Sequence, residues 1–277
     1  MLVTALLLPG PAVAGTVSGG TFTAAPGEKN DVRYDAYAPP PVPTVVDNGA
    51  PLIVGPGCME GTPVTCAFTN GVTLRLGDRA DKGSASAYIV ATVYGEQGDD
   101  VIQADAEEPQ AYGGPGDDQI RVSGNQVLGH GERGNDTVEG PFQSGVTTSL
   151  WGDEGDDTVI QRTHTSRCWI YGGRGADRLL SLTCTQSGGP GDDVMTRFLD
   201  VIVGGVMNGD EGGDIMIGGR AADTFDGGPG GDFIQAAADG VADTVVCGTG
   251  NDIVRANAAD SVAADCENVT RVEAPAP

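Results

Sequence analysis

Aspartate and glycine recur in this chain at fixed distances from one another. The stretch 113–120 reads GGPGDDQI, so Asp118 follows Gly113 by five residues and Gly116 by two, and apolar Ile120 comes two residues later. Carboxylates on glycine-rich turns suit a hard cation such as Ca²⁺, which prefers oxygen ligands. Glycine is suited to such turns because it adopts backbone angles that a Cβ atom forbids. The pattern therefore predicts a calcium site.

The same positions recur along the chain. The predicted metal-binding aspartates are Asp100, Asp118, Asp136, Asp157, Asp177, Asp193, Asp214, Asp232 and Asp252, the last with Cys247 at the first glycine position. The predicted metal-loop glycines are Gly95, Gly113, Gly131, Gly152, Gly209 and Gly227 at the first position, and Gly98, Gly116, Gly134, Gly155, Gly212 and Gly230 at the second. A single Asp-Gly turn is common in β proteins, but nine in one register indicate a repeated site.

The spacing of these aspartates predicts the elements that position them. Successive members are 18, 18, 21, 20, 16, 21, 18 and 20 residues apart. Short alternating segments between the loops are typical of strands, and helix signals are nearly absent. We therefore expect an all-β fold, a parallel β-roll or β-solenoid of about 18 residues per turn with its glycine loops stacked on one side. The apolar residues two after each aspartate should form an inward ladder: Ile102, Ile120, Val138, Val159, Leu179, Met195, Met216, Ile234 and Val254.

A second aspartate series appears late in the chain. Its members are Asp223, Asp243 and Asp260, each followed two positions later by an apolar residue. The glycine two before the aspartate is lost, because Ala221, Val241 and Ala258 occupy that position. We call the first series rail A and the second rail B, and expect calcium mainly on rail A.

Four segments are predicted. Residues 1–14 have a short apolar core and end in Ala12-Val13-Ala14, which is typical of a secretory signal peptide, although a basic start is absent. Residues 15–49 are expected to be an extended cap over the first turn, because a stack of repeats needs its open edge covered. Residues 50–270 form the predicted roll, and 271–277 a disordered tail. The expected location is extracellular.

Charge narrows the possible partners. The chain has 39 acidic against 15 basic residues and a formal net charge of −24. Nucleic acids and anionic membrane surfaces attract basic patches, so neither is an expected partner, whereas cations are. After residue 14 no apolar run approaches the roughly 20 residues that span a bilayer, so membrane insertion is not expected.

The six cysteines predict disulfides. They are Cys58 and Cys66, Cys168 and Cys184, and Cys247 and Cys266, and they form three pairs close in sequence. An even count in an exported protein favours disulfides. The latter two pairs are each separated by about one predicted turn, which would bring the partners into adjacent coils.

Residues 227–235, GGPGGDFIQ, match the pattern G-G-x-G-x-D-x-U-x throughout, where U is apolar. This resembles the hemolysin-type calcium-binding repeat, the RTX nonapeptide, over about residues 76–262. The resemblance implies a parallel β-roll with several Ca²⁺ ions between stacked loops, bound by backbone carbonyl groups and aspartate carboxylates. The C-terminal stretch is similar to that of secreted actinobacterial proteins with these repeats.

Two functions remain open at this point. The first is a secreted calcium-binding protein with calcium-dependent folding and a structural or interaction role; a cell-surface or polysaccharide partner is unidentified. It would not be an enzyme, because His130 and His164 are the only histidines and no known catalytic motif surrounds them. The alternative is a calcium-dependent, polysaccharide lyase-like enzyme on a β-solenoid. That reading requires the only dense basic group, Arg162, Arg167, Arg174 and Arg178, to gather on one face.

Overall fold

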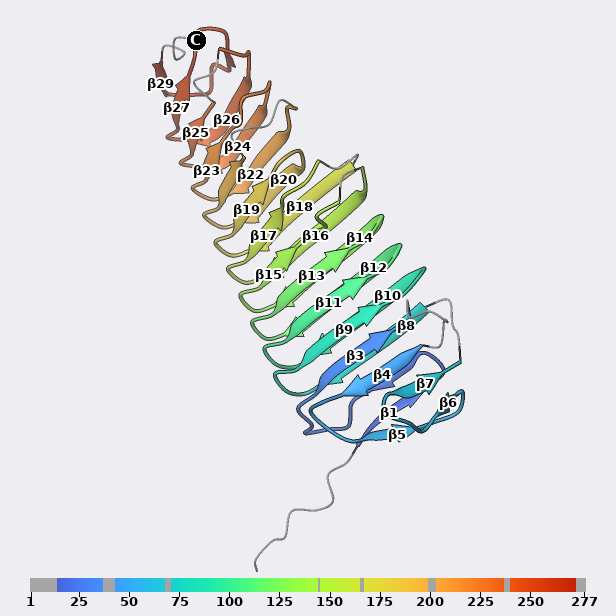
Figure 1. Cartoon of the computed structure of the whole chain (residues 1–277). Coiled ribbons are helices and arrows are strands. Elements are labelled where there is room, and N and C mark those ends of the chain that lie inside the picture. Colours follow the sequence, from blue (N-terminus) through green and yellow to red (C-terminus); the bar gives the residue numbers. More distant parts are fainter. Residues whose placement is uncertain are drawn as a thin grey trace, which may run out of the picture.

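The protein is an elongated rod of β-strands (Figure 1). The computed structural model describes residues 14–36, 43–67, 71–143, 145–164, 167–198, 203–236 and 240–272. The predicted signal peptide, apart from Ala14, and the predicted tail from residue 273 lie outside these ranges. Within them every element is a strand, and no helix long and apolar enough to cross a membrane is found.

The strands form two sheets. Sheet A has 14 strands, β1 (Gly15–Ser18), β2 (Thr21–Thr23), β5 (Leu52–Val54), β8 (Gly71–Gly77), β10 (Val90–Glu96), β12 (Glu108–Pro115), β14 (Gln126–Arg133), β16 (Thr147–Glu154), β18 (Arg167–Arg174), β20 (Thr185–Pro190), β22 (Val206–Glu211), β24 (Thr224–Gly230), β26 (Thr244–Gly250) and β28 (Ser261–Val262). Sheet B has 15 strands, β3 (Asp31–Asp35), β4 (Thr44–Asp47), β6 (Cys58–Met59), β7 (Val64–Cys66), β9 (Lys82–Ser86), β11 (Val101–Asp105), β13 (Gln119–Ser123), β15 (Thr137–Glu139), β17 (Thr158–Gln161), β19 (Arg178–Ser181), β21 (Val194–Arg197), β23 (Ile215–Ile217), β25 (Phe233–Gln235), β27 (Ile253–Ala256) and β29 (Asn268–Arg271).

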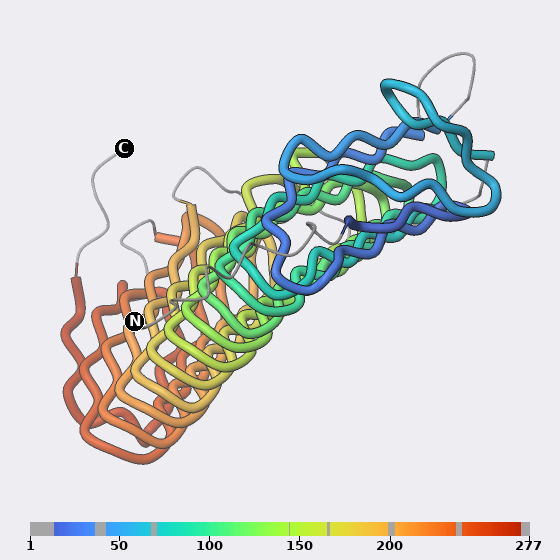
Figure 2. The backbone as a smooth tube through the Cα atoms, turned by 90° about the horizontal axis from the view of Figure 1, so that it is seen from below, coloured from blue at the N-terminus to red at the C-terminus, as the bar shows by residue number. Residues whose placement is uncertain are grey.

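From β8 onward the chain winds as a β-solenoid. Consecutive strands alternate between the two sheets, and neighbours within each sheet are parallel, so each coil adds one strand to both sheets (Figure 2). The structure has about nine turns of about 20 residues, close to the 18 expected from the aspartate spacing. The register pairs Ile102 with Ile120 and Ile120 with Val138. The distance between successive motifs is therefore the length of one coil.

The core lies between the two sheets. All nine apolar residues predicted to form the inward ladder are buried, each with at most 2% of its surface exposed. They face sheet A residues such as Leu150, Ile170 and Phe225, which are fully buried. Apolar side chains at alternate positions of both sheets therefore fill the rod, and this predicted part of the fold is confirmed.

The N-terminal strands extend both sheets with a different topology. Strand β2 pairs with β8 in parallel and with β1 antiparallel, while β3 pairs with β9 in parallel and with β4 antiparallel. Antiparallel strands therefore lie beyond the first parallel coil in both sheets. Assignment of residues 15–49 as a protective cap stays a prediction.

Three disulfides link the six cysteines in the predicted pairs. Cys58–Cys66 joins β6 to β7, with Cα atoms 3.9 Å apart. The Cα separations are 4.5 Å for Cys168–Cys184 and 5.2 Å for Cys247–Cys266. The latter pair attaches the segment between β28 and β29 to β26, near the end of the rod.

Candidate metal site

Rail A is a continuous column of buried carboxylates. Each aspartate lies where the chain passes from a sheet A strand to a sheet B strand, and all nine have at most 2% of their surface exposed. The Oδ1 atom of each accepts a hydrogen bond from the backbone N–H of the aspartate one turn earlier. Asp100 N donates to Asp118 Oδ1 over 2.7 Å, and Asp118 N to Asp136 Oδ1 over the same distance. The bond repeats through Asp157, Asp177, Asp193, Asp214, Asp232 and Asp252.

Residues outside the glycine motif complete both ends of the column. At the N-terminal end Asp81 is 1% exposed; its backbone N–H donates to Asp100 Oδ1, and its own Oδ1 accepts from Asn30 N. At the other end Asp252 N donates to Glu267 Oε2 over 3.1 Å. The sequence motif does not identify Asn30 or Glu267, since neither has a flanking glycine pattern.

The second oxygen of each rail A carboxylate is an orphan. The Oδ2 atoms of Asp81 and of all nine rail A aspartates are buried and have no hydrogen-bond partner. A buried anionic oxygen without a partner is costly, because it has lost water and gained nothing in return. The column thus requires a proton or a cation at repeated positions.

The first loop glycine leaves the space into which this oxygen projects. A Cβ atom at Gly131 would lie 2.5 Å from Gly152 O and 2.8 Å from Asp136 Cβ, and would also collide with Asp136 Oδ2. An added Cβ atom would meet an equivalent pair of oxygens at seven further glycines. One is the Oδ2 atom of the aspartate in the same loop, and the other is a backbone carbonyl oxygen of the next turn. These glycines are Gly95, Gly113, Gly152, Gly172, Gly188, Gly209 and Gly227. Only glycine leaves these oxygens in place, which explains the fixed distance of five residues.

The oxygen set fits a hard cation. Ca²⁺ takes 6–8 oxygen ligands from carboxylates and backbone carbonyl groups. Within the described ranges no group of three His, Cys, Asp or Glu side chains could hold a metal ion by itself. A cation on rail A would therefore draw much of its coordination from the loop carbonyl groups, which the glycines bring close to the carboxylates.

One protein-family model matches part of the region that contains these loops. Residues 92–120 and 208–240 match the RTX calcium-binding nonapeptide repeat. These two segments carry RTX calcium-binding repeats. Neither a curated protein nor a solved structure matches the chain.

The RTX geometry continues between the two matched segments. Asp136, Asp157, Asp177 and Asp193 lie outside both, yet they keep the ladder hydrogen bond and the orphan Oδ2 atom. Asp177 follows an alanine, and its turn is no exception. The rail A loops therefore form a single stack from Asp100 to Asp252.

The second position of the RTX loop adopts a left-handed conformation. Where it is not glycine it is acidic, with φ of 73° at Glu96, 77° at Glu132, 79° at Asp153 and 70° at Asp210. The carboxylates of Asp153 and Asp210 engage side chains on the sheet A surface. Asp153 Oδ2 lies 2.8 Å from His130 Nδ1, and Asp210 Oδ2 accepts from Ser187 Oγ over 2.5 Å.

A second, exposed ladder runs beside rail A. The residue before the motif aspartate accepts a hydrogen bond from the backbone of the next turn, as in Asp99 Oδ1 from Asp117 N at 3.1 Å and Asp117 Oδ1 from Asn135 N at 2.8 Å. Asp156 and Asp192 do the same. These carboxylates therefore join successive turns and add negative charge beside the rail A loops.

Rail B is a shorter ladder of aspartates, and an arginine side chain pairs with its first member. Asp223 N donates to Asp243 Oδ1 and Asp243 N to Asp260 Oδ1, over 2.7 and 3.0 Å. At its N-terminal end the guanidinium of Arg197 donates to Asp223 Oδ1 over 2.9 Å. Both side chains are 1% exposed, so a buried ion pair stands at the start of rail B. Sequence reasoning missed Arg197, which lies 26 residues before its partner.

Burial makes the rail A carboxyls hard to ionise. Desolvation, and then repulsion from neighbouring carboxylates, raises the pKa of Asp100, Asp118, Asp136 and Asp157 from 3.8 to about 7, against the opposing effect of the backbone hydrogen bond. The pKa of Asp193 rises to about 8, and those of Asp177 and Asp214 to about 6. Burial therefore favours the protonated form of these carboxyl groups in the folded rod when no cation is bound.

This predicts an unusual pH dependence for the calcium-free protein. The folded-state pKa values exceed the unfolded value of 3.8, so protonation favours the folded state. That stability is fully present below about pH 4 and is lost as pH rises through 6–8. In chelator, the urea midpoint should be higher at pH 5 than at pH 8, and excess Ca²⁺ should reduce or reverse this difference. A chelated protein that is more stable at pH 8 would contradict the prediction.

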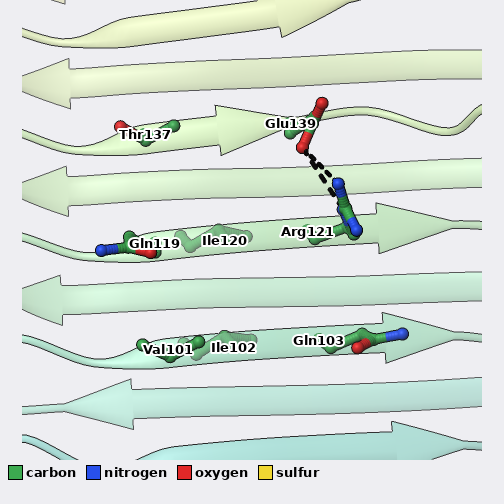
Figure 3. Close-up of a pocket in the computed structure, with 8 residues that line it drawn as sticks. All are labelled: Val101, Ile102, Gln103, Gln119, Ile120, Arg121, Thr137 and Glu139. Carbon is green, nitrogen blue, oxygen red and sulfur yellow. Dashed lines mark hydrogen bonds and ion pairs between the residues drawn. The ribbon is translucent and has the colours of Figure 1, made fainter.

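The residues considered for catalysis do not assemble. Arg167 and Arg174 lie at opposite ends of β18 in sheet A, Arg178 begins β19 in sheet B, and Arg162 lies 3.7 Å from Glu139. A hollow of about 400 Å³ on sheet B crosses β11, β13 and β15, where the Arg121–Glu139 ion pair links two strands (Figure 3). Its other polar side chains are Gln103, Gln119 and Thr137, which offer no nucleophile–base pair.

Proposed function

We propose that the protein is a secreted calcium-binding β-roll whose rail A loops bind several Ca²⁺ ions and whose folded rod depends on them. The single observation that carries this is the column of buried, unpartnered Oδ2 atoms facing carbonyl oxygens of the next turn. The proposed ligands are the nine rail A aspartates together with carbonyl groups of the twelve loop glycines named above. Bound calcium would supply the positive charge that these oxygens lack.

Calcium-dependent folding follows from the same column. Stacked carboxylates repel one another and have lost their water, so the apo rod is disfavoured at neutral pH. A ligand that binds only the folded state stabilises it by an amount that grows with its concentration. With several sites, the calcium of an extracellular environment would decide whether the rod folds.

A secreted location is supported by the three disulfides and by the signal-like stretch of residues 1–14. Disulfides persist in oxidising compartments. The proposed role is structural or interactive rather than catalytic. The lyase-like alternative gains no support, because the arginines it requires are distributed over both sheets.

Calorimetric titration of Ca²⁺ into the chain tests the proposal. The wild type should bind several ions. Asp118→Ala should bind fewer, because it removes one carboxylate from the two loops that it joins, and Asp136→Ala should act in the same way one turn further on.

The matched control is Asp105→Ala, at the far end of β11 from the rail A loop. It removes the same charge but no rail A oxygen, so calcium stoichiometry should stay at the wild-type value. Equal losses in Asp105→Ala and Asp118→Ala would show a general charge effect and would refute the assignment. A wild type that binds no calcium would do the same.

A further inference from the structure

A column of stacked rings runs along the outer face of sheet A. Its members are Tyr94, Tyr112, His130, Trp151 and Tyr171, each directly before a first loop glycine. The strand register aligns them, and successive ring centroids are 5.1, 5.5, 4.4 and 5.4 Å apart. Neighbouring planes differ by at most 11°. The ring faces therefore point along the rod, and the inner members cover one another.

The two ends of this aromatic column differ. At the N-terminal end the guanidinium of Arg75 lies 4.5 Å from the centroid of Tyr94 and covers its outer face. At the other end Tyr171 pairs in register with Ser187 of β20, whose side chain is small. Among the described residues no ring stacks on that face of Tyr171. The column thus has one closed end and one open end.

A hollow of about 760 Å³ lies at the open end. Tyr171 lines it together with Ser187, Gly188, Gly189 and Pro190 of β20, and it continues along the column beside His130 and Tyr112. Ser187 holds the sixth level with a small side chain, so no ring fills the space on the open face of Tyr171. Both the volume and the aromatic face of Tyr171 are suited to a small ring-shaped ligand.

Polar groups surround this hollow. Three acceptors already have partners there: Glu154 with Arg133 at 3.1 Å, Asp153 with His130 at 2.8 Å, and Asp210 with Ser187. Arg174 and Glu132 also line the hollow and are exposed, with no ion pair among the described residues. The rim therefore offers hydrogen-bond donors and acceptors around an aromatic floor, with charge of both signs.

We propose that this hollow is a carbohydrate subsite in which one pyranose ring of a glycan stacks on the open face of Tyr171. The C–H face of a pyranose carries partial positive charge and matches the negative face of an aromatic ring. Its hydroxyl groups would meet Ser187 and Arg174 at the rim. A purely aromatic ligand would stack equally well, but it would leave those polar groups without partners.

The test is calorimetric titration of the calcium-loaded chain with cellohexaose, maltohexaose and hexagalacturonate, two neutral probes and one acidic. At least one should bind with a Kd of millimolar order or tighter. Tyr171→Ala should weaken that binding by about tenfold or more, since it removes the stacking face. Ser187→Tyr should abolish it, because the new ring would fill the hollow and continue the column.

Tyr94→Ala is the matched control. It removes the same side chain from the same column beside the equivalent glycine, but at the closed end and outside the hollow. Glycan binding should stay at the wild-type level in this variant. Circular dichroism and calcium stoichiometry should be unchanged in all three variants, which separates loss of the subsite from loss of the fold.

Two results would overturn the proposal. One is the absence of binding for all three oligosaccharides at about 10 mM, well above the expected Kd. The other is binding that Tyr94→Ala and Tyr171→Ala weaken equally, which would locate the glycan elsewhere on the rod. Neither result would affect the calcium sites, which are tested by a separate titration.

Discussion

Replacing Arg197 with methionine should destabilise the protein by about 3–5 kcal/mol, the usual cost of removing one partner from a buried ion pair. The guanidinium donates to Asp223 Oδ1 and to the carbonyl groups of Leu182 and Val203. The Arg197 side chain that makes these contacts has 1% of its surface exposed. Methionine would fill the space but leave the Asp223 carboxylate buried without its cation. Urea denaturation in saturating calcium gives the measurement.

A double variant separates the charge from the packing. Arg197→Met combined with Asp223→Asn removes both charges, so it should be more stable than Arg197→Met alone. Arg197→Lys keeps the charge but not the planar donor group that reaches two carbonyl groups, and should fall between wild type and Arg197→Met. If the double variant is no more stable than the single one, the ion pair is not what holds the start of rail B.

Gly131→Ala should be strongly destabilising and should weaken calcium binding. The backbone angle at Gly131 is one that alanine accepts, so the cost is steric alone. The added Cβ atom would lie 2.5 Å from Gly152 O, which belongs to the next turn. Stacked turns at a spacing of about 4.8 Å cannot separate locally without breaking ladder hydrogen bonds. We expect a loss of about 3 kcal/mol or more, with fewer calcium ions bound.

Gly213→Ala provides the control. Gly213 lies in a rail A loop as well, but an added Cβ atom would meet its nearest neighbour, Asp192 Oδ1, at 3.4 Å, an ordinary contact. Its stability should change by less than about 1 kcal/mol and its calcium stoichiometry should match the wild type. Equal damage from both substitutions would mean that loop flexibility, and not the space beside Asp136, accounts for the glycine pattern.

Much of the fold could be predicted from the sequence because one motif is repeated along the chain. Nine aspartates in one register gave the coil spacing, and the residue two positions after each, such as Ile102 or Met195, proved to be buried. Two of the three cysteine pairs followed from the same spacing. Each of these inferences rests on a local pattern copied along the chain, so a departure at a single position such as Cys247 did not matter.

Contacts that occur only once in the chain could not be predicted from the repeated motif. Arg197 and Asp223 are 26 residues apart, and no periodicity in the sequence relates them. Glu267 ends rail A with a longer side chain and without a glycine loop, so the motif could not find it. The aromatic column was accessible in principle, because Tyr112, His130 and Trp151 all precede a first glycine. Aligning that position as well as the aspartate would have revealed it.

The rail A hydrogen bonds all run in one direction, and this gives the rod a polarity. Each turn donates its amide to a carboxylate that lies later in the chain, so no turn is complete until its successor has been added. A rod shortened from its C-terminal end would always present an unpaired amide. One shortened from its N-terminal end would present a rail A carboxylate oxygen, which water or a cation can satisfy, but also the amides that the exposed ladder pairs with the preceding turn. Along rail A itself, Glu267 is the residue that ends the ladder, so a transplanted stack would need an acceptor of this kind at its C-terminal end.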